Sequence, residues 1–140
     1  EEENRIVKTT TGTKISEILP VINASQIIVL QRLIRNVPVS DHVIDYAVDL
    51  VRKTRPRGVD TPPYISEMVN WGAGPRASQC LILGAKARAV LKGRYTASVD
   101  DVKFVATAVL RHRLVTSFNA EAEGVTSLDL IQHLIKGTKP

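Results

Sequence analysis

The segment from Gly72 to Arg76 combines residue types that could bind an anion. Gly72 and Gly74 leave the backbone open to a ligand, and Pro75 suits the first turn of a helix, so that Arg76 would be its second residue. A cation near the positive end of a helix dipole is disfavoured by about 0.3–1 kcal/mol. Two explanations fit Arg76: a phosphate that faces its planar fork of donors, or an ordinary surface ion pair with Asp or Glu.

Other chemistry-bearing residues lack the spacing that a site would need. The chain has no Gly-Lys dipeptide, which excludes a complete phosphate-binding loop. The histidines and the cysteine lie in separate segments without ligand spacing, so no metal site is predicted: His42, Cys80, His112 and His133. A set of Ser117, His112 and Asp100 has no nucleophile elbow to support it.

Length and composition indicate one folded domain. The chain has 140 residues, of which 44% are hydrophobic and 24% charged, with a net charge of +5. Its longest uncharged stretch, Ile18 to Gln31, is too short to cross a membrane and contains Pro20. A single cysteine favours a reducing compartment, so we expect the cytoplasm. The start at Glu1, with neither Met nor a signal peptide, predicts a fragment of a longer protein.

Hydrophobic periodicity predicts an all-α fold, a small bundle of about five to six helices. The longest helix is expected at Pro75 to Lys92, followed by Gly93, and its nearly continuous apolar surface predicts a central position. Ser98 and Asp101 resemble a capping box at the start of another helix, and Asn23 with Gln26, as well as Ser127, fit helix caps. Other helices are expected at Glu1 to Thr10, Asn23 to Asn36, Ser40 to Arg55, and from Ser127, with one or two turns at Tyr64 to Asn70.

Two further details of this prediction concern packing and loops. The helix after Ser40 places Val43, Ile44, Ala47, Val48 and Val51 on one face, which we expect to be buried. Lys14 to Leu19 fits a short extended segment, and Arg55 to Pro63 and Glu121 to Thr126 fit loops.

Several motifs, in order and spacing, resemble the C-terminal helical lid of MoxR-type AAA+ ATPases. The similarity covers nearly the whole chain, because the first half of that lid is similar to Val37 to Ser40, Tyr46 and Arg52 to Arg55. The remaining motifs are Tyr64 to Ser78, Lys86 to Ala89, Gly93-Arg94, Val99 to Val102, Val109 to Leu114, and Glu121 to Gly124.

The resemblance implies a role for the anion-binding motif. Arg76 corresponds to the "sensor 2" arginine, which assists ATP hydrolysis in the full-length protein, and Gly74, Pro75 and Arg76 would contact the ATP phosphates from the lid side. Gly74 stands where the family usually has a small hydroxyl residue, and glycine is an adequate helix cap. The resemblance assigns no role to Arg111, His112, Arg113 or the residues from Glu121 to Gly124.

The resemblance also implies what surrounds this domain. The parent would be an ATP hydrolase that uses ATP and Mg, with its phosphate loop, magnesium-binding acid and arginine finger upstream of Glu1. The chain alone would be neither an enzyme nor a tight ATP binder. Its partners would be its own AAA+ core domain and the neighbouring subunits of a ring, a hexamer, together with a client that carries a von Willebrand factor A domain.

Two alternatives belong to other classes of protein. A helical nucleic-acid-binding module would use the net charge of +5 and a basic cluster, Arg52, Lys53, Arg55, Arg57, Arg111 and Arg113, and would bind in a salt-dependent manner. A purely structural interaction domain would use Arg76 in a surface ion pair worth about 0–1 kcal/mol.

Overall fold

The computed structural model describes residues 1–13 and 19–139, which form two compact units, Glu1–Leu30 and Gln31–Pro140. The extended segment expected at Lys14 to Leu19 therefore lies outside the described residues, apart from Leu19. Within the described ranges, no helix is long and apolar enough to cross a membrane.

The first unit contains α1 (Glu2–Thr10) and the beginning of α2 (Ala24–Asn36), and the boundary between the units lies within α2. The cap expected at Asn23 is present: its side-chain oxygen accepts from the Gln26 amide at 2.9 Å, and Gln26 Oε1 accepts from the Asn23 amide at 2.8 Å. Neither α1 nor α2 has a buried residue.

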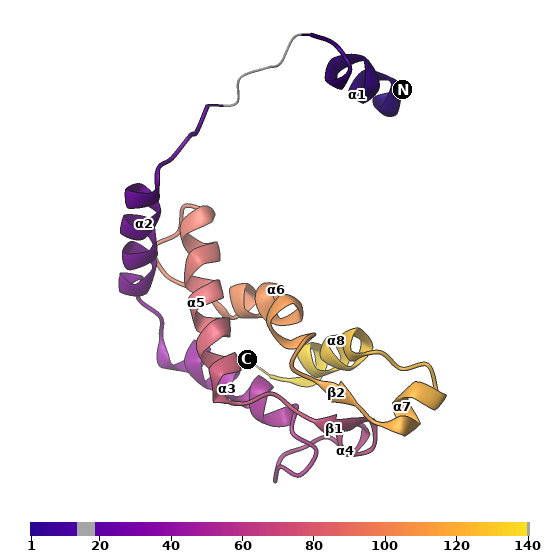
Figure 1. Ribbon diagram of the computed structural model, residues 1–140. Coiled ribbons are helices and arrows are strands. Elements are labelled where there is room, and N and C mark those ends of the chain that lie inside the picture. Colours follow the sequence, from indigo (N-terminus) through magenta and orange to yellow (C-terminus); the bar gives the residue numbers. More distant parts are fainter. Residues whose placement is uncertain (14–18, 140) are drawn as a thin grey trace. The chain divides into compact units, whose positions relative to one another are not determined.

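The second unit contains the remaining helices and a small sheet (Figure 1). The described residues include eight helices, so the all-α prediction is confirmed but the expected number was too low. The elements are α3 (Asp41–Lys53), α4 (Pro63–Met68), β1 (Val69–Trp71), α5 (Pro75–Leu91), α6 (Val99–Leu110), β2 (Val115–Thr116), α7 (Phe118–Ala122) and α8 (Ser127–Gly137).

The core lies among α3, α5, α6 and α8 (Figure 1). Helices α3 and α6 contact each other, and both contact α5 and α8. Helix α5 packs against both α3 and α6, as its apolar sequence predicted, and buries one residue per turn: Ala77, Leu81, Ala85 and Ala89. The helix ends where expected, with Gly93 just beyond it at φ +68°, a conformation that glycine adopts without strain. Leu91 at its last turn is 86% exposed.

The buried face of α3 differs from the predicted face. Val43, Ala47 and Val51 are buried as expected, but Ile44 and Val48 are more than one-third exposed. Tyr46 and Leu50 are buried in their place. The apolar arc of this helix is wide, so its neighbours, rather than the periodicity, decide which part of the arc faces the core.

Strands β1 and β2 form an antiparallel pair that the sequence did not predict. Val69 pairs with Thr116 and Trp71 with Val115, and an irregularity in register lies between the two pairs. With three and two residues, the strands are too short to show an alternating pattern. Ser117 adds two hydrogen bonds beside this strand pair: its amide donates to the Met68 carbonyl at 2.9 Å, and its hydroxyl donates to the Glu67 carbonyl at 2.7 Å.

Candidate functional site

Arg76 is the second residue of α5, as predicted. Gly74 precedes the helix in an extended conformation, with φ −87° and ψ 177°, and its carbonyl accepts the first helical hydrogen bond from the Ala77 amide at 2.9 Å. Pro75 occupies the first position, where the absence of an N–H costs nothing. Gly74, Pro75 and Arg76 are all exposed, so the start of the longest helix is open to solvent.

The Arg76 side chain has no ion-pair or hydrogen-bond partner among residues 1–13 and 19–139. This result does not favour the structural alternative, in which a carboxylate of the same domain would pair with Arg76. The guanidinium therefore carries a positive charge that the described part of the chain leaves uncompensated, at the helix end where a cation is least favoured.

The turn before α5 is fixed by the end of α3. Thr54 is completely buried, and its hydroxyl accepts from the Ala73 amide at 2.9 Å while donating to the Val51 carbonyl at 2.7 Å. Arg55 is half-buried, and its Nε donates to the Ala73 carbonyl at 3.0 Å. Consecutive side chains thus hold both polar groups of Ala73, and Arg76 follows three residues later.

The two glycines of the motif have different roles. A Cβ at Gly72 would lie 2.3 Å from the Thr54 carbonyl oxygen, so this glycine allows the end of α3 to approach the turn. A Cβ at Gly74 would have nothing within 4 Å. The expectation that both glycines make room for a ligand is therefore wrong for Gly72, which makes room for the protein's own backbone.

The chemistry of these groups fits a phosphate. A guanidinium suits phosphate oxygens, and the dipole of α5 adds a partial positive charge at the same end. Two hollows lie elsewhere on the domain, one of about 580 Å³ beside Gly124 and one of about 480 Å³ beside Tyr95. Arg76 lines neither of them and lies on an open surface. An anion bound to Arg76 would need further hydrogen-bond donors from another domain or subunit.

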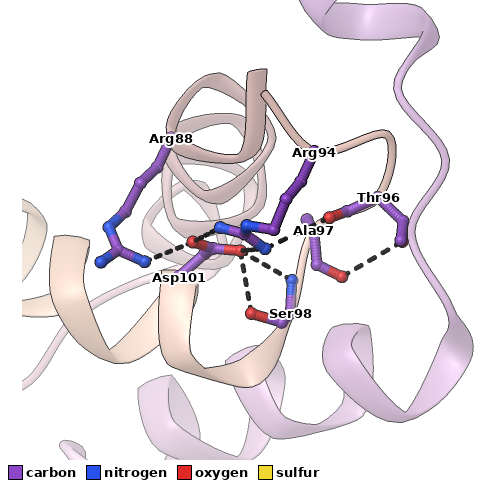
Figure 2. Close-up of polar contacts among 6 residues, drawn as sticks. All are labelled: Arg88, Arg94, Thr96, Ala97, Ser98 and Asp101. Atoms are coloured by element: carbon purple, nitrogen blue, oxygen red, sulfur yellow. Dashed lines mark hydrogen bonds and ion pairs between the residues drawn. The ribbon is translucent and has the colours of Figure 1, made fainter. Parts of the chain in front are cut away.

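A second group of charged side chains lies around Asp101, apart from Arg76 (Figure 2). It is completely buried at the start of α6. Arg94 binds it through two hydrogen bonds, of 2.8 Å to Oδ2 and 2.5 Å to Oδ1, and Arg88 donates to Oδ1 as well. The Ser98 amide and hydroxyl each donate to Oδ2 at 2.9 Å, so the expected capping residue is in place.

These contacts set the protonation state of Asp101. Burial by itself would raise the pKa of the carboxyl, but the hydrogen bonds from Arg94, Ser98 and Arg88 lower the pKa well below its usual range. The hydrogen bond with Asp101 also raises the pKa of Arg94. Asp101 is therefore ionised throughout the physiological pH range.

The Asp101 cluster, defined as Arg88, Arg94, Ser98 and Asp101, joins separate parts of the sequence. Arg88 comes from the last part of α5, Arg94 from the following loop, and Ser98 and Asp101 from the start of α6. The Arg88 guanidinium also lies 4.1 Å from the centroid of the Phe104 ring. Three motifs of the family resemblance thus meet in one structural ion cluster, which ties α5 to α6.

Arg113 makes contacts within the domain. Its guanidinium donates to the Val109 carbonyl at the end of α6 and lies 3.8 Å from Cys80 Sγ in α5. His112 Nε2 lies 2.5 Å from the same guanidinium. In the other motif without an assigned role, Glu121 belongs to α7 and Gly124 adopts φ +69° just after that helix.

Several residues of the proposed basic cluster contact other groups of the domain. Arg52 Nη2 lies 3.8 Å from Asp60 Oδ2, and Lys53 Nζ lies 2.6 Å from Asp49 Oδ2. The Arg55 guanidinium donates to the Ala73 carbonyl, as described above. These contacts do not favour the nucleic-acid alternative, because part of the positive charge is already balanced within the domain.

Sequence reasoning missed the contribution of Thr54 and Arg55 to the site. The sequence analysis placed Arg55 at the end of a helix and in a basic cluster, and neither placement gave it a partner within the domain. Its contact with Ala73 spans 18 residues of sequence, and no local pattern reports such a pairing.

Comparison with known proteins identifies the domain. Residues 64–134, about half of the chain, match the protein family described as AAA lid domain. Over 125 residues the chain is 30% identical to the uncharacterized protein YeaC of Bacillus subtilis, with 89% of this chain and 36% of YeaC covered. Over 135 residues it is 29% identical to the chaperone MoxR1 of Mycobacterium tuberculosis, with 96% and 36% covered.

A solved structure agrees on the fold. A crystal structure of a protein from Cytophaga hutchinsonii, proposed to be an ATPase, superposes with a TM-score of 0.89 and 23% identity, covering 98% of this chain and 42% of that one. The chain spans about a third of the length of the two curated relatives. The chain belongs to the AAA lid domain family, and it is a lid of the kind found in MoxR-like AAA+ ATPases.

Proposed function

We propose that this lid senses the nucleotide of an AAA+ ATPase and that Arg76 contacts the terminal phosphates of ATP. The observation that carries the proposal is the exposed guanidinium at the start of α5, without a carboxylate partner among residues 1–13 and 19–139. Gly74 and Pro75 present this end of the helix from the lid side. In this role Arg76 stabilises charge that develops on the phosphates during hydrolysis.

The lid would act only together with an ATP-binding core. Arg76 offers one cationic group on an open surface, whereas hydrolysis also needs a phosphate-binding loop, Mg²⁺ and a positioned water. We propose that the core supplies these groups and that the whole chain serves as its lid. A contact that differs between ATP and ADP would change the preferred lid position, and neighbouring subunits of a hexameric ring would respond to that change.

The name of the relative MoxR1 extends the proposal to the biological role. A chaperone remodels other proteins, so we propose a client protein, with a von Willebrand factor A domain as the candidate class. The single, partly buried Cys80 agrees with a cytoplasmic site of action.

The test is the variant Arg76→Ala in the full-length ATPase. Hydrogen bonds to charged groups contribute about 1.5–3 kcal/mol, so loss of Arg76 should lower kcat about ten- to a hundredfold. Steady-state ATP turnover measures this effect, and size-exclusion chromatography checks that the assembly is intact. Arg57→Ala is the matched control, because Arg57 is an exposed arginine outside α5, and it should leave kcat within about twofold. Unchanged turnover in an intact Arg76→Ala assembly would refute the proposed role.

A further inference from the structure

The backbone of Ala73 is held at both its amide and its carbonyl by two consecutive residues. The Thr54 hydroxyl accepts from its amide at 2.9 Å, and Arg55 Nε donates to its carbonyl at 3.0 Å. We call these two contacts the Ala73 clamp. Both side chains come from the residues directly after α3, whereas Ala73 belongs to the turn that leads into α5.

The clamp fixes an orientation as well as a position. A single hydrogen bond would leave the turn free to rotate about that contact, but bonds to the amide and to the carbonyl of one residue orient the two peptide planes on either side of its Cα. Gly72 permits this close approach, because a Cβ there would lie 2.3 Å from the Thr54 carbonyl oxygen. The direction in which the first residues of α5 leave the turn therefore depends on Thr54 and Arg55.

Ala73 is buried, so its amide and its carbonyl need partners from within the protein. A completely buried hydroxyl and a half-buried guanidinium supply both partners. Arg55 is oriented by this bond and has no carboxylate within 4 Å among residues 1–13 and 19–139. The Arg55 guanidinium therefore contacts the turn that leads to Arg76.

We propose that Thr54 and Arg55 are positioning residues for Arg76, which act by setting the start of α5 through the Ala73 clamp. This inference rests on the proposed phosphate contact of Arg76. A displacement of a charged group by about 1 Å is sufficient to reduce catalysis strongly, so loss of the clamp should impair turnover while Arg76 itself is still present.

The test is a double-mutant cycle on ATP turnover by the full-length ATPase, with Arg55→Ala, Arg76→Ala and the combined variant. We expect Arg55→Ala to lower kcat about three- to tenfold with the KM for ATP changed less than about twofold. In the Arg76→Ala background the same change should alter kcat by less than about twofold, because the residue being positioned is gone. Arg57→Ala, two residues away and exposed, is the charge-matched control.

The outcomes separate the two proposals. If Arg76→Ala leaves kcat unchanged, the proposed function fails. If Arg76→Ala lowers kcat but Arg55→Ala does not, or if the two losses multiply fully, the positioning role is wrong while the role of Arg76 stands.

A second pair of variants tests the other contact of the clamp. Thr54→Ser keeps the hydroxyl that accepts from Ala73 and should retain kcat within about twofold, whereas Thr54→Val removes the hydroxyl at nearly constant volume and should lower kcat about as much as Arg55→Ala. Circular dichroism melting of each variant reports whether the domain is folded. Equal turnover of folded Thr54→Val and Thr54→Ser proteins would overturn the inference for Thr54.

Discussion

Asp101 and Arg76 illustrate opposite uses of a charged side chain. Asp101 is buried and accepts hydrogen bonds from two arginines and from Ser98, so its charge is balanced within the domain. Arg76 is exposed and has no such partner among the described residues. A buried charge must be paired to be tolerated, whereas an exposed one can remain available for a ligand.

Replacement of Asp101 by Asn should destabilise the domain. Asn cannot balance two arginines, and its amide would place a donor against them, so we expect a loss of about 2–4 kcal/mol in the free energy of unfolding. Arg88 and Arg94 keep some contact with water, with side chains 24% and 40% exposed, and this moderates the loss. Urea denaturation measures it. Asp100→Asn, at the exposed neighbouring position, should change stability by less than about 0.5 kcal/mol.

The pH dependence follows from the lowered pKa of Asp101. The carboxyl has a pKa near 3.8 when unfolded and a lower one when folded, so its contribution is fully present above about pH 5. The contribution is lost as the pH falls through 3.8 toward the folded pKa. The stability difference between the wild-type domain and Asp101→Asn should therefore shrink from pH 7 to pH 3, and a constant difference would contradict the assignment.

Helix α5 is the element that links the two charged sites. Arg76 lies at its beginning and Arg88 near its end, while the buried line of Ala77, Leu81, Ala85 and Ala89 holds the helix against its neighbours. Small alanines allow close approach of α3 and α6, and Leu81 is the largest side chain of that line. The position of Arg76 is thus set at the turn by the clamp and along the helix by the core.

Two leucines on α5 allow a matched test of this packing. Leu81 is completely buried and Leu91 is 86% exposed. Leu81→Ala should reduce the free energy of unfolding by about 2–5 kcal/mol because it creates a cavity. Leu91→Ala removes the same atoms from an exposed site and should change it by less than about 0.5 kcal/mol. Similar losses for both variants, measured by urea denaturation, would show that α5 is packed differently.

At the scale of the whole molecule, burial is concentrated in the second unit. Neither α1 nor α2 contains a buried residue, whereas α3, α5, α6 and α8 together contribute most of the core. Stability should therefore come almost entirely from Gln31–Pro140.

Truncation at each end tests this distribution. Deletion of residues 1–21 keeps the Asn23 cap and should change the free energy of unfolding by less than about 1 kcal/mol. Deletion of residues 127–140 removes Leu130, Ile131 and Leu134, which are buried, and should abolish cooperative unfolding because total stability is only about 5–15 kcal/mol. Thermal melts followed by circular dichroism compare the two. A large loss in the first truncation would assign a stabilising role to the N-terminal unit.

Local signals predicted the main helices well and the short elements poorly. The limits of α5 and the caps at Asn23 and Ser98 were predicted because each depends on residues only a few positions apart. The cap of the last helix was predicted one residue too late: Thr126, not Ser127, is the capping residue, and Ser127 is the first helical residue. Helix α7 was not predicted, and its last two residues, Glu121 and Ala122, fall in the segment interpreted as a loop, because five residues are too few to show a helical period.

The sequence by itself determined the helical class, the family and the place of Arg76 at the start of the longest helix, because these follow from local spacing and motif order. Tertiary structure alone decided the buried face of α3, the pairing of β1 with β2, the cluster around Asp101 and the contacts of Thr54 and Arg55 with Ala73. Each of these joins groups distant in sequence or selects among equivalent apolar positions. The physical reason is that such contacts depend on how packed elements approach one another, which no local pattern encodes.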